Sequence, residues 1–340
     1  MIPARLVDDD TLPPSPEVLP PPWPGREVDV DGVTLYVRDT RATAPGAEPA
    51  LYVHGLGGSS QNWTDLAGLL SGRLDGQAID LPGSGRSGPA PRSGYTQAAF
   101  AALVGRWIEQ AGRGPVHLVG NSLGGAVVAR LAATRPELVR TLTLVSPAMP
   151  VLRPGPAHRR MLPVLVVPRV ERLVERVVRQ VTPEQMVQGV LENCFGDPNR
   201  VSAQRRDEAV REAAYRLDLP WAAEAYVRSL RGLVYSYLRP GNLSLWSLVR
   251  RIAAPTLVVW GSRDRLVNVR LAPRTARAIP DSRLLILEGV GHTAQLEMPR
   301  ILARALAGLL EDVSGGRGSA GRDRRGAVGP RGAVGTEEAS

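Results

Sequence analysis

A serine between two glycines, at the junction of an apolar run and a helix, constrains the fold of this chain more than any other feature. Ser122 lies between Gly120 and Gly124. Residues 115–119 are short and apolar enough for a buried strand, and the small residues of 125–133 predict a helix. At such a turn the serine adopts a strained backbone, and side chains two positions away would make the strand and the helix collide. The pattern predicts a nucleophile elbow.

The elbow would expose the Ser122 hydroxyl at the N-terminus of a helix. The backbone amide of Leu123 there points toward any negative charge that develops beside the serine. A short Gly-x-Ser-x-Gly pattern also arises by chance in loops rich in glycine and serine. The rest of the chain therefore has to decide between a catalytic serine and a tight turn.

Short apolar segments alternate with helical segments on both sides of the elbow. Residues 26–30 and 33–38, joined by Asp31-Gly32, carry the pattern of an antiparallel hairpin. The alternation as a whole predicts an α/β fold with a doubly wound, mostly parallel sheet. Further strands are expected at 50–53, 77–80, 115–119, 139–145, 255–260 and 283–287, and helices at 62–70, 95–110, 125–133 and 299–310.

The same pattern divides the chain into five segments. Residues 1–26 form a proline-rich lead-in that is expected to be extended, and 27–147 form the first part of the core. Residues 148–250 show no strand pattern and predict an inserted helical cap. The second part of the core is 251–312, and the Gly- and Arg-rich tail at 313–340 is expected to be disordered. Within the cap, helices are expected at 169–180, 183–193, 203–216 and 220–238.

All 42 basic residues are arginine, and the formal net charge is +9. A charge of this sign can attract nucleic acid or an anionic membrane surface. No nucleic-acid-binding motif accompanies it, and aromatic residues make up 4% of the chain, too few to stack on bases. We therefore expect solvated surface arginine and no nucleic-acid partner. Recruitment to nucleic acid or to a membrane through the arginine-rich cap and tail is the alternative.

The cysteine content and the distribution of apolar residues indicate the cellular compartment in which the protein is expected. Cys194 is the one cysteine, which excludes an internal disulfide and fits a reducing compartment. The first ten residues lack the apolar core of a secretory signal peptide, and no apolar run reaches the roughly 18 residues of a transmembrane helix. We expect a cytoplasmic protein without stable membrane insertion. The oligomeric state stays open.

A serine hydroxyl is protonated at neutral pH, so it needs a base within hydrogen-bond reach, and the base needs an acceptor that orients it. His292 follows the predicted strand 283–287, at the sheet edge where the catalytic groups of open α/β folds gather. The other histidines have structural interpretations. We expect His117 in the core, His54 bracing a loop and His158 in the cap, so His292 is the predicted base.

Asp264 is the candidate that orients this base. It lies four residues past the predicted strand end at Trp260, on the same sheet edge as His292. An aspartate at this position can also cap a turn. Asp281 precedes a strand and therefore lies on the opposite edge. The order Ser122, Asp264, His292 differs from the trypsin-like and subtilisin-like orders.

Two loops near the sheet edge are rich in glycine. His54-Gly55-Leu56-Gly57-Gly58-Ser59 follows a buried strand, and it is either a tight turn or a second source of amides for an oxyanion. In the loop after the next strand, Asp80, Arg86 and Ser87 are expected to fix the loop and to take no part in chemistry.

Together these motifs, from about Asp31 to Leu310, resemble the α/β-hydrolase superfamily. The resemblance implies a serine hydrolase that needs no cofactor or metal. Ser122 would be the nucleophile, His292 the general base and then the general acid, and Asp264 its orienting partner. The resemblance is carried by His54-Gly55, the 80–87 loop, the elbow, the cap insertion, Gly261-Ser262-Arg263-Asp264 and Gly291-His292.

The resemblance also implies an oxyanion hole made by the amides of Leu56 and Leu123. Haloalkane dehalogenases and epoxide hydrolases would carry aspartate as the nucleophile, so Ser122 argues against both. The expected substrate is a small-molecule carboxylic ester, with a lipid-like acyl group suggested by the apolar cap segment 161–170.

Two alternatives stay open. The elbow and the stretch Gly291-His292-Thr293-Ala294-Gln295-Leu296-Glu297 are also similar to the meta-cleavage-product C–C bond hydrolases, although those usually carry Trp where this chain has Thr293. Such an enzyme would need a cap arginine for a substrate carboxylate, and the cap offers many. The other alternative is a non-catalytic ligand-binding protein on a hydrolase scaffold.

Overall fold

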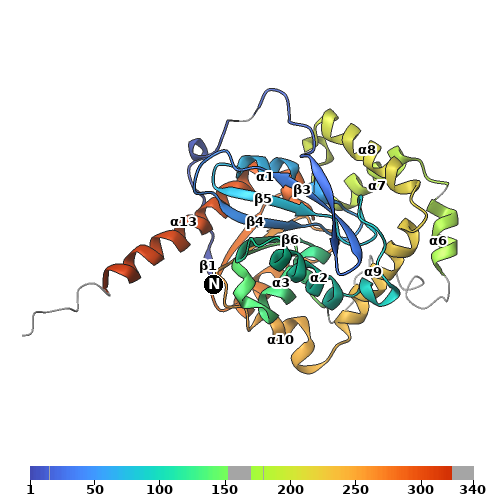
Figure 1. Ribbon diagram of the computed structural model, residues 1–340. Coiled ribbons are helices and arrows are strands. Elements are labelled where there is room, and N and C mark those ends of the chain that lie inside the picture. The colour runs from blue at the N-terminus through green and yellow to red at the C-terminus, as the bar shows by residue number, and fades with distance from the viewer. Residues whose placement is uncertain (15, 152–169, 179, 324–340) are drawn as a thin grey trace, which may run out of the picture.

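The computed structural model describes residues 1–14, 16–151, 170–178 and 180–323, with a nine-stranded sheet at its centre (Figure 1). The strand order is β1-β9-β8-β7-β6-β4-β5-β3-β2. Strand β3 pairs antiparallel with β2 and β5, and all other neighbours are parallel, which confirms the predicted α/β class. The strands are β1 Ile2–Pro3, β2 Gly25–Val30, β3 Val33–Thr40, β4 Glu48–Val53, β5 Leu74–Ile79, β6 Val116–Asn121, β7 Val139–Val145, β8 Thr256–Gly261 and β9 Ser282–Leu287.

The predicted hairpin is the β2–β3 pair. Asp31 and Gly32 at its turn have φ of 52° and 78°. Positive φ at both central residues matches the twist of the flanking strands, and the side chain of Asp29 accepts a hydrogen bond from the amide of Gly32 at 3.1 Å. The Asp-Gly signal is therefore confirmed.

Helices cover both faces of the sheet. One apolar cluster joins the sheet to α2, α3, α10 and α11, and a second joins the opposite face to α1 and α13. Neighbouring residues of one strand face opposite clusters, as with Leu51 and Tyr52 of β4. The helices outside the insertion are α1 Thr64–Leu69, α2 Gln97–Gln110, α3 Leu123–Thr134, α11 Leu271–Ala278, α12 Ala294–Glu297 and α13 Pro299–Asp323.

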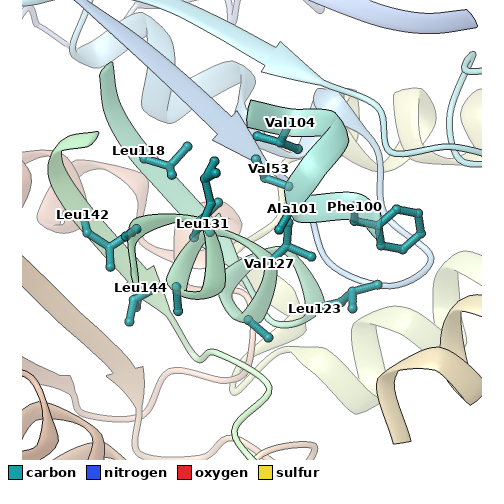
Figure 2. Packing of buried hydrophobic residues seen from close by; sticks show 14 of the residues in the cluster. Val53, Phe100, Ala101, Val104, Leu118, Leu123, Val127, Leu131, Leu142 and Leu144 are labelled. Atoms are coloured by element: carbon teal, nitrogen blue, oxygen red, sulfur yellow. The ribbon is translucent and has the colours of Figure 1, made fainter. Parts of the chain in front are cut away.

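The first cluster holds the elbow helix in place. Figure 2 shows side chains of α2, such as Phe100 and Val104, packing near Val127 and Leu131 of α3 and near Leu118 of the elbow strand. Nearly every residue of α3 is buried, which explains why its sequence is made of small apolar residues. The position of the serine at its start is thus fixed by core packing.

The helical insertion is the segment between β7 and β8. Its described helices are α6 Val170–Val178, α7 Pro183–Cys194, α8 Ala203–Leu217, α9 Ala222–Tyr237 and α10 Leu245–Val249. Helices α6 to α9 lie beyond the ends of the strands, on the right in Figure 1. Helix α10 instead packs on α3 and belongs to the core. His158 and residues 161–169 of the predicted apolar segment lie outside the described residues.

The lead-in is more structured than its prolines suggest. Ile2 and Pro3 form an edge strand parallel to β9, and Val7 and Leu12 are buried in the second apolar cluster. Trp23 donates a hydrogen bond to the carbonyl of Thr64 at 2.9 Å. Scattered apolar residues between the prolines therefore anchor the lead-in along the core.

The C-terminal helix also differs from the prediction. Helix α13 continues past the expected end at Leu310 to Asp323, so the boundary proposed at 313 falls inside a helix. Extending a helix that is already packed on a core is easier than starting a new one, which lets α13 run into a glycine-rich sequence. Residues 324–340 lie outside the described part of the chain. No helix within the described residues has the length and apolarity needed to cross a membrane.

Candidate active site

Ser122 lies at a sharp turn between β6 and α3. Its φ is 53°, a left-handed conformation that non-glycine residues seldom adopt. A side-chain carbon on Gly120 would lie 2.6 Å from the side chain of Val128, and one on Gly124 would collide with the carbonyl of Val53. Both glycines are therefore required by packing, as the elbow pattern predicts.

The structure brings Asp264 and His292 together at the carboxyl edge of the sheet. Nδ1 of His292 lies 2.8 Å from Oδ2 of Asp264, and the two side chains are 4% and 0% exposed. The other carboxylate oxygen of Asp264 accepts hydrogen bonds from the amides of Leu266 and Val267, each at 2.9 Å. An ionised carboxylate only accepts, so Nδ1 carries the proton and Nε2 is left as a base.

Ser122 is connected to this pair through its neighbour in the chain. The side-chain amide of Asn121 donates to the carbonyl of His292 at 3.2 Å and to that of Val145 at 3.0 Å. Within the described residues no hydrogen bond joins the Ser122 hydroxyl to the imidazole. Catalytic hydrogen bonds are often long before a substrate binds, so this geometry is compatible with a serine–histidine pair.

The loop of His292 is also tied to the helical insertion. The amide of His292 donates to the carbonyl of Cys194, at the end of α7, at 2.6 Å. Burial, together with the charge of Asp264, raises the pKa of the Cys194 thiol to about 12. Cys194 therefore stays protonated at neutral pH and is no rival nucleophile.

Glu297 is a buried carboxylate that the motif search did not single out. Its two oxygens accept hydrogen bonds from the amides of Gly291, Gly196 and Asp197 at 2.7, 3.0 and 2.9 Å, and Arg200 pairs with it at 2.7 Å. It thus joins the loop of the predicted base to the insertion. A glutamate five residues after the histidine was visible in the sequence, but its partners about a hundred residues away were not.

The glycine-rich loop after β4 lies against the elbow. A side-chain carbon on Gly55 would approach Cβ of Ser122 to 3.0 Å, a tight contact that shows how closely the loop packs against the serine. Leu56 follows in this loop, and Leu123 is the first residue of α3. The two predicted oxyanion amides therefore come from the two segments that flank the serine.

His54 braces this loop, as predicted. Its Nε2 accepts a hydrogen bond from the amide of Leu81 at 2.9 Å, and its Nδ1 lies 2.7 Å from the carbonyl of Gly55. These contacts require the neutral ring protonated on Nδ1. Burial lowers the pKa of His54, and the charge of Asp80 opposes this shift. His117 is 2% exposed, in agreement with a core position.

The loop after β5 is fixed by the residues expected to fix it. The carboxylate of Asp80 accepts hydrogen bonds from the amides of Ser60 and Arg86, and the Ser87 hydroxyl donates to the carbonyl of Asp80 at 2.7 Å. Asp80 is 1% exposed. All of its contacts hold the backbone, which is the predicted structural role.

Arg216 of α8 is a further residue that sequence reasoning did not identify. Its guanidinium donates to the carbonyl of Gly57 and contacts Sδ of Met186 at 2.8 Å. No carboxylate lies within ion-pair distance of it in the described part of the chain, although Glu212 and Tyr226 lie near enough to raise its pKa. Burial dominates and lowers the pKa of Arg216. The insertion thus places a weakly compensated cation beside the glycine-rich loop.

Metal-binding side chains do not gather in this site. Across the described ranges, no group of three or more His, Cys, Asp or Glu side chains is arranged to hold a metal ion.

A family model for the alpha/beta hydrolase fold matches residues 49–299 of the chain. The match includes the elbow, the helical insertion and the loops that carry Asp264 and His292. Since it covers well over half of the sequence, the chain belongs to the α/β hydrolase family.

Three relatives show the range of activities found among similar sequences. The dihydrolipoyllysine-residue acetyltransferase component of the acetoin cleaving system of Cupriavidus necator is 33% identical over 79% of this chain, which spans only 64% of that relative. Monoacylglycerol lipase abhd6-B of Xenopus laevis is 26% identical, over 79% of this chain and 77% of the lipase. A 2-hydroxy-6-oxononadienedioate/2-hydroxy-6-oxononatrienedioate hydrolase of Cupriavidus pinatubonensis is 24% identical, over 82% and 92%.

Solved structures agree with this family. A membrane phospholipase A is 25% identical with a TM-score of 0.67, and the match covers 86% of this chain and 87% of that one. A thermophilic esterase from Thermogutta terrifontis is 21% identical with a TM-score of 0.65, covering 85% and 99%, and shows the shared fold. The protein is an α/β hydrolase, with hydrolases among its relatives.

Proposed function

We propose that the protein is a serine hydrolase that cleaves a carboxylic ester through an acyl-enzyme. The observation that carries this proposal is the strained Ser122, with φ of 53°, at the sheet edge that also holds the His292–Asp264 pair. Strained backbone at a non-glycine residue persists where the surrounding structure holds it, and such residues are concentrated at active sites. The similarity to a monoacylglycerol lipase supports a lipid-like ester as substrate.

The geometry suggests the following sequence of steps. Oγ of Ser122 attacks the ester carbonyl while Nε2 of His292 takes its proton, and Asp264 stabilises the imidazolium through Nδ1. The amides of Leu56 and Leu123 hold the oxyanion of the tetrahedral intermediate. The imidazolium then protonates the leaving alcohol. A water molecule, activated by His292, hydrolyses the acyl-enzyme and releases the acid.

Replacing the nucleophile tests the proposal. Ser122→Ala should reduce the release of p-nitrophenol from p-nitrophenyl esters by about 10⁴-fold or more, because the acyl-enzyme can no longer form. The matched control is Ser84→Ala, in the loop after β5, which should hydrolyse the esters like the wild type. A fluorophosphonate should phosphonylate Ser122, with loss of fluoride, in the wild type and in Ser84→Ala but not in Ser122→Ala. Full activity of Ser122→Ala would refute the proposal.

C–C bond hydrolysis is the second candidate, and Arg216 is the observation that favours it. A cation beside the glycine-rich loop, without an ion-pair partner in the described chain, could hold the carboxylate of a vinylogous dienoate. The relative from Cupriavidus pinatubonensis acts on substrates of this kind by name. If this candidate is correct, Arg216→Met should raise KM for a 2-hydroxy-6-oxodienoate by about tenfold or more while Arg211→Met has no effect. No turnover of the dienoate by the wild type would eliminate it.

We also infer a cytoplasmic location and a small-molecule substrate without a nucleic-acid partner. The supporting observations are the single cysteine, half-buried at the end of α7, and the many arginines held in ion pairs, such as Arg5, Arg73 and Arg300. Fractionation of cells producing the protein, together with co-sedimentation with anionic vesicles, tests this inference. Binding of the protein to the vesicles that falls steeply with salt concentration would contradict the inference, because it would show an anionic partner.

A further inference from the structure

A cavity of about 620 Å³ lies between the proline-rich lead-in, α1 and the helices α7 and α8. This volume is within the range of small-molecule sites, roughly 300–1,000 Å³. Apolar side chains of its walls come from the lead-in, α1 and α7, namely Leu19 and Trp23 of the lead-in, Leu69 of α1, and Val187 and Leu191 of α7. Neither Ser122 nor His292 is part of the lining, so the cavity is distinct from the catalytic groups themselves.

The lead-in is a fixed wall of this cavity. Gln204 and Arg205, at the start of α8, donate hydrogen bonds to the carbonyls of Leu19 and Pro20, both at 2.9 Å. Trp23 is held on the other side by the carbonyl of Thr64. The proline-rich segment is therefore bonded to the insertion and to the core at the same time, and it shapes the space between them.

Most charged side chains along the cavity are paired; Arg206 and Arg216 are the lining residues for which the described part of the chain shows no ion pair. Arg205 pairs with Asp65 at 2.6 Å and with Glu208 at 2.5 Å. The Glu297–Arg200 pair described above and a 2.6 Å hydrogen bond from Gln61 to Glu212 satisfy further charges. Apart from these paired charges, the surface that a ligand would contact is predominantly apolar. An uncharged aliphatic chain suits such a surface.

Part of the cavity wall is formed by the candidate oxyanion loop. Gly57 and Gly58 line it, directly after Leu56, and Arg216 lines it beside them, with its guanidinium on the carbonyl of Gly57. A cation beside Gly57 suits the carboxyl end of an acyl group, which becomes a carboxylate on hydrolysis.

We propose that this cavity binds the aliphatic chain of the acyl group, with the carboxyl end toward Gly57 and Arg216. The proposal rests on the ester-hydrolase function and narrows the substrate class to esters of long-chain fatty acids. In this proposal the proline-rich lead-in forms part of the wall of the acyl site. Acyl-chain preference is then decided by residues of the lead-in, α7 and α8, away from the catalytic groups.

Filling the cavity tests the proposal. Ala209 of α8 and Val190 of α7 are exposed and line the cavity, so a tryptophan at either position fills space without displacing the core. Ala209→Trp and Val190→Trp should each reduce kcat/KM for p-nitrophenyl dodecanoate by about tenfold or more and leave that for p-nitrophenyl acetate within about twofold. Arg211→Trp, exposed on α8 and outside the cavity lining, is the matched control and should change neither value.

Binding of sodium dodecanoate to the wild type and the same variants, measured by calorimetry, separates the two proposals. Dodecanoate that binds the wild type and Arg211→Trp, but not the two cavity variants, supports the acyl site even if no ester is hydrolysed. Ester hydrolysis whose chain-length profile is the same in all four proteins overturns the acyl site and leaves the serine hydrolase standing. Equal binding of dodecanoate to all four also overturns it.

Discussion

Replacing Asp264 tests how the orientation of His292 contributes to catalysis, because the other proposed catalytic groups stay in place. In Asp264→Asn the side-chain oxygen can keep the two loop amides, which turns the NH₂ group toward Nδ1 of His292. The imidazole proton then moves to Nε2, and the ring can no longer accept the serine proton. We expect kcat to fall about 10⁴-fold with little change in the melting temperature.

Steady-state kinetics on a p-nitrophenyl ester, together with thermal unfolding, measures this effect. Asp281→Asn is the matched control, because Asp281 is an exposed aspartate at the opposite edge of the sheet. Equal activity of the two variants would remove Asp264 from the proposed triad.

His54 makes the folded state sensitive to acid. Burial lowers its pKa from the ordinary value of 6.5, so between the two pKa values the unfolded chain binds more protons than the folded one. The stabilisation from neutral His54 is therefore complete above about pH 6.5 and is lost as the pH falls toward the lower, folded pKa. We expect the free energy of unfolding to drop by up to about 1.4 kcal/mol per pH unit in this window.

Urea unfolding at several pH values between 8 and 5 measures this slope. His54→Gln should be less stable at neutral pH, because the hydrogen bonds to Leu81 and Gly55 are weakened. Its stability should depend less on pH than that of the wild type. The same slope in both proteins would show that His54 does not titrate on unfolding.

At the level of elements, Glu297 couples the loop of the predicted base to the insertion. Glu297→Gln replaces one acceptor oxygen with an NH₂ group that faces backbone donors, and it removes the charge that pairs with Arg200 at 2.7 Å, leaving Arg200 its 3.9 Å contact with Asp197. Buried charged hydrogen bonds are worth about 1.5–3 kcal/mol each, but Arg200 is partly solvated, so we expect a total loss of about 2–3 kcal/mol in unfolding free energy.

The same change should lower kcat, because the loop of His292 loses its attachment to residues 196–197. Urea unfolding and ester kinetics on Glu297→Gln and on Glu288→Gln, an exposed glutamate of the neighbouring turn, test both effects. Identical values in the two variants would mean that Glu297 has no coupling role.

Elements with a strong local pattern could be predicted from the sequence. The elbow, the Asp-Gly hairpin and the central strands carry their own signals, since a buried strand or a left-handed turn restricts nearby residue types. Strand β1 has only two residues, one of them proline, so no periodicity reveals it. The contacts of Glu297 and Arg216 join residues far apart in the chain, and nothing local encodes them.

For the molecule as a whole, the two ends of the described chain stabilise each other. Strand β1 adds to the sheet beside β9, Arg5 pairs with Glu311 at 2.8 Å, and Arg300 pairs with Asp9 at 2.7 Å. Exposed ion pairs contribute little, about 0–1 kcal/mol each. The larger contribution is therefore expected from the apolar residues that the lead-in buries.

Leu12 is the sharpest test of this arrangement. It is 5% exposed and packs in the cluster formed by α1, α13 and one face of the sheet. Leu12→Ala leaves a cavity there, and we expect the free energy of unfolding to fall by about 2–3 kcal/mol. Activity on p-nitrophenyl acetate should persist, because Leu12 touches none of the proposed catalytic groups. Val18→Ala, at a lead-in position that is 79% exposed, should change neither quantity. If Leu12→Ala is as stable as Val18→Ala in urea, the lead-in is an appendage to the fold and does not belong to its core.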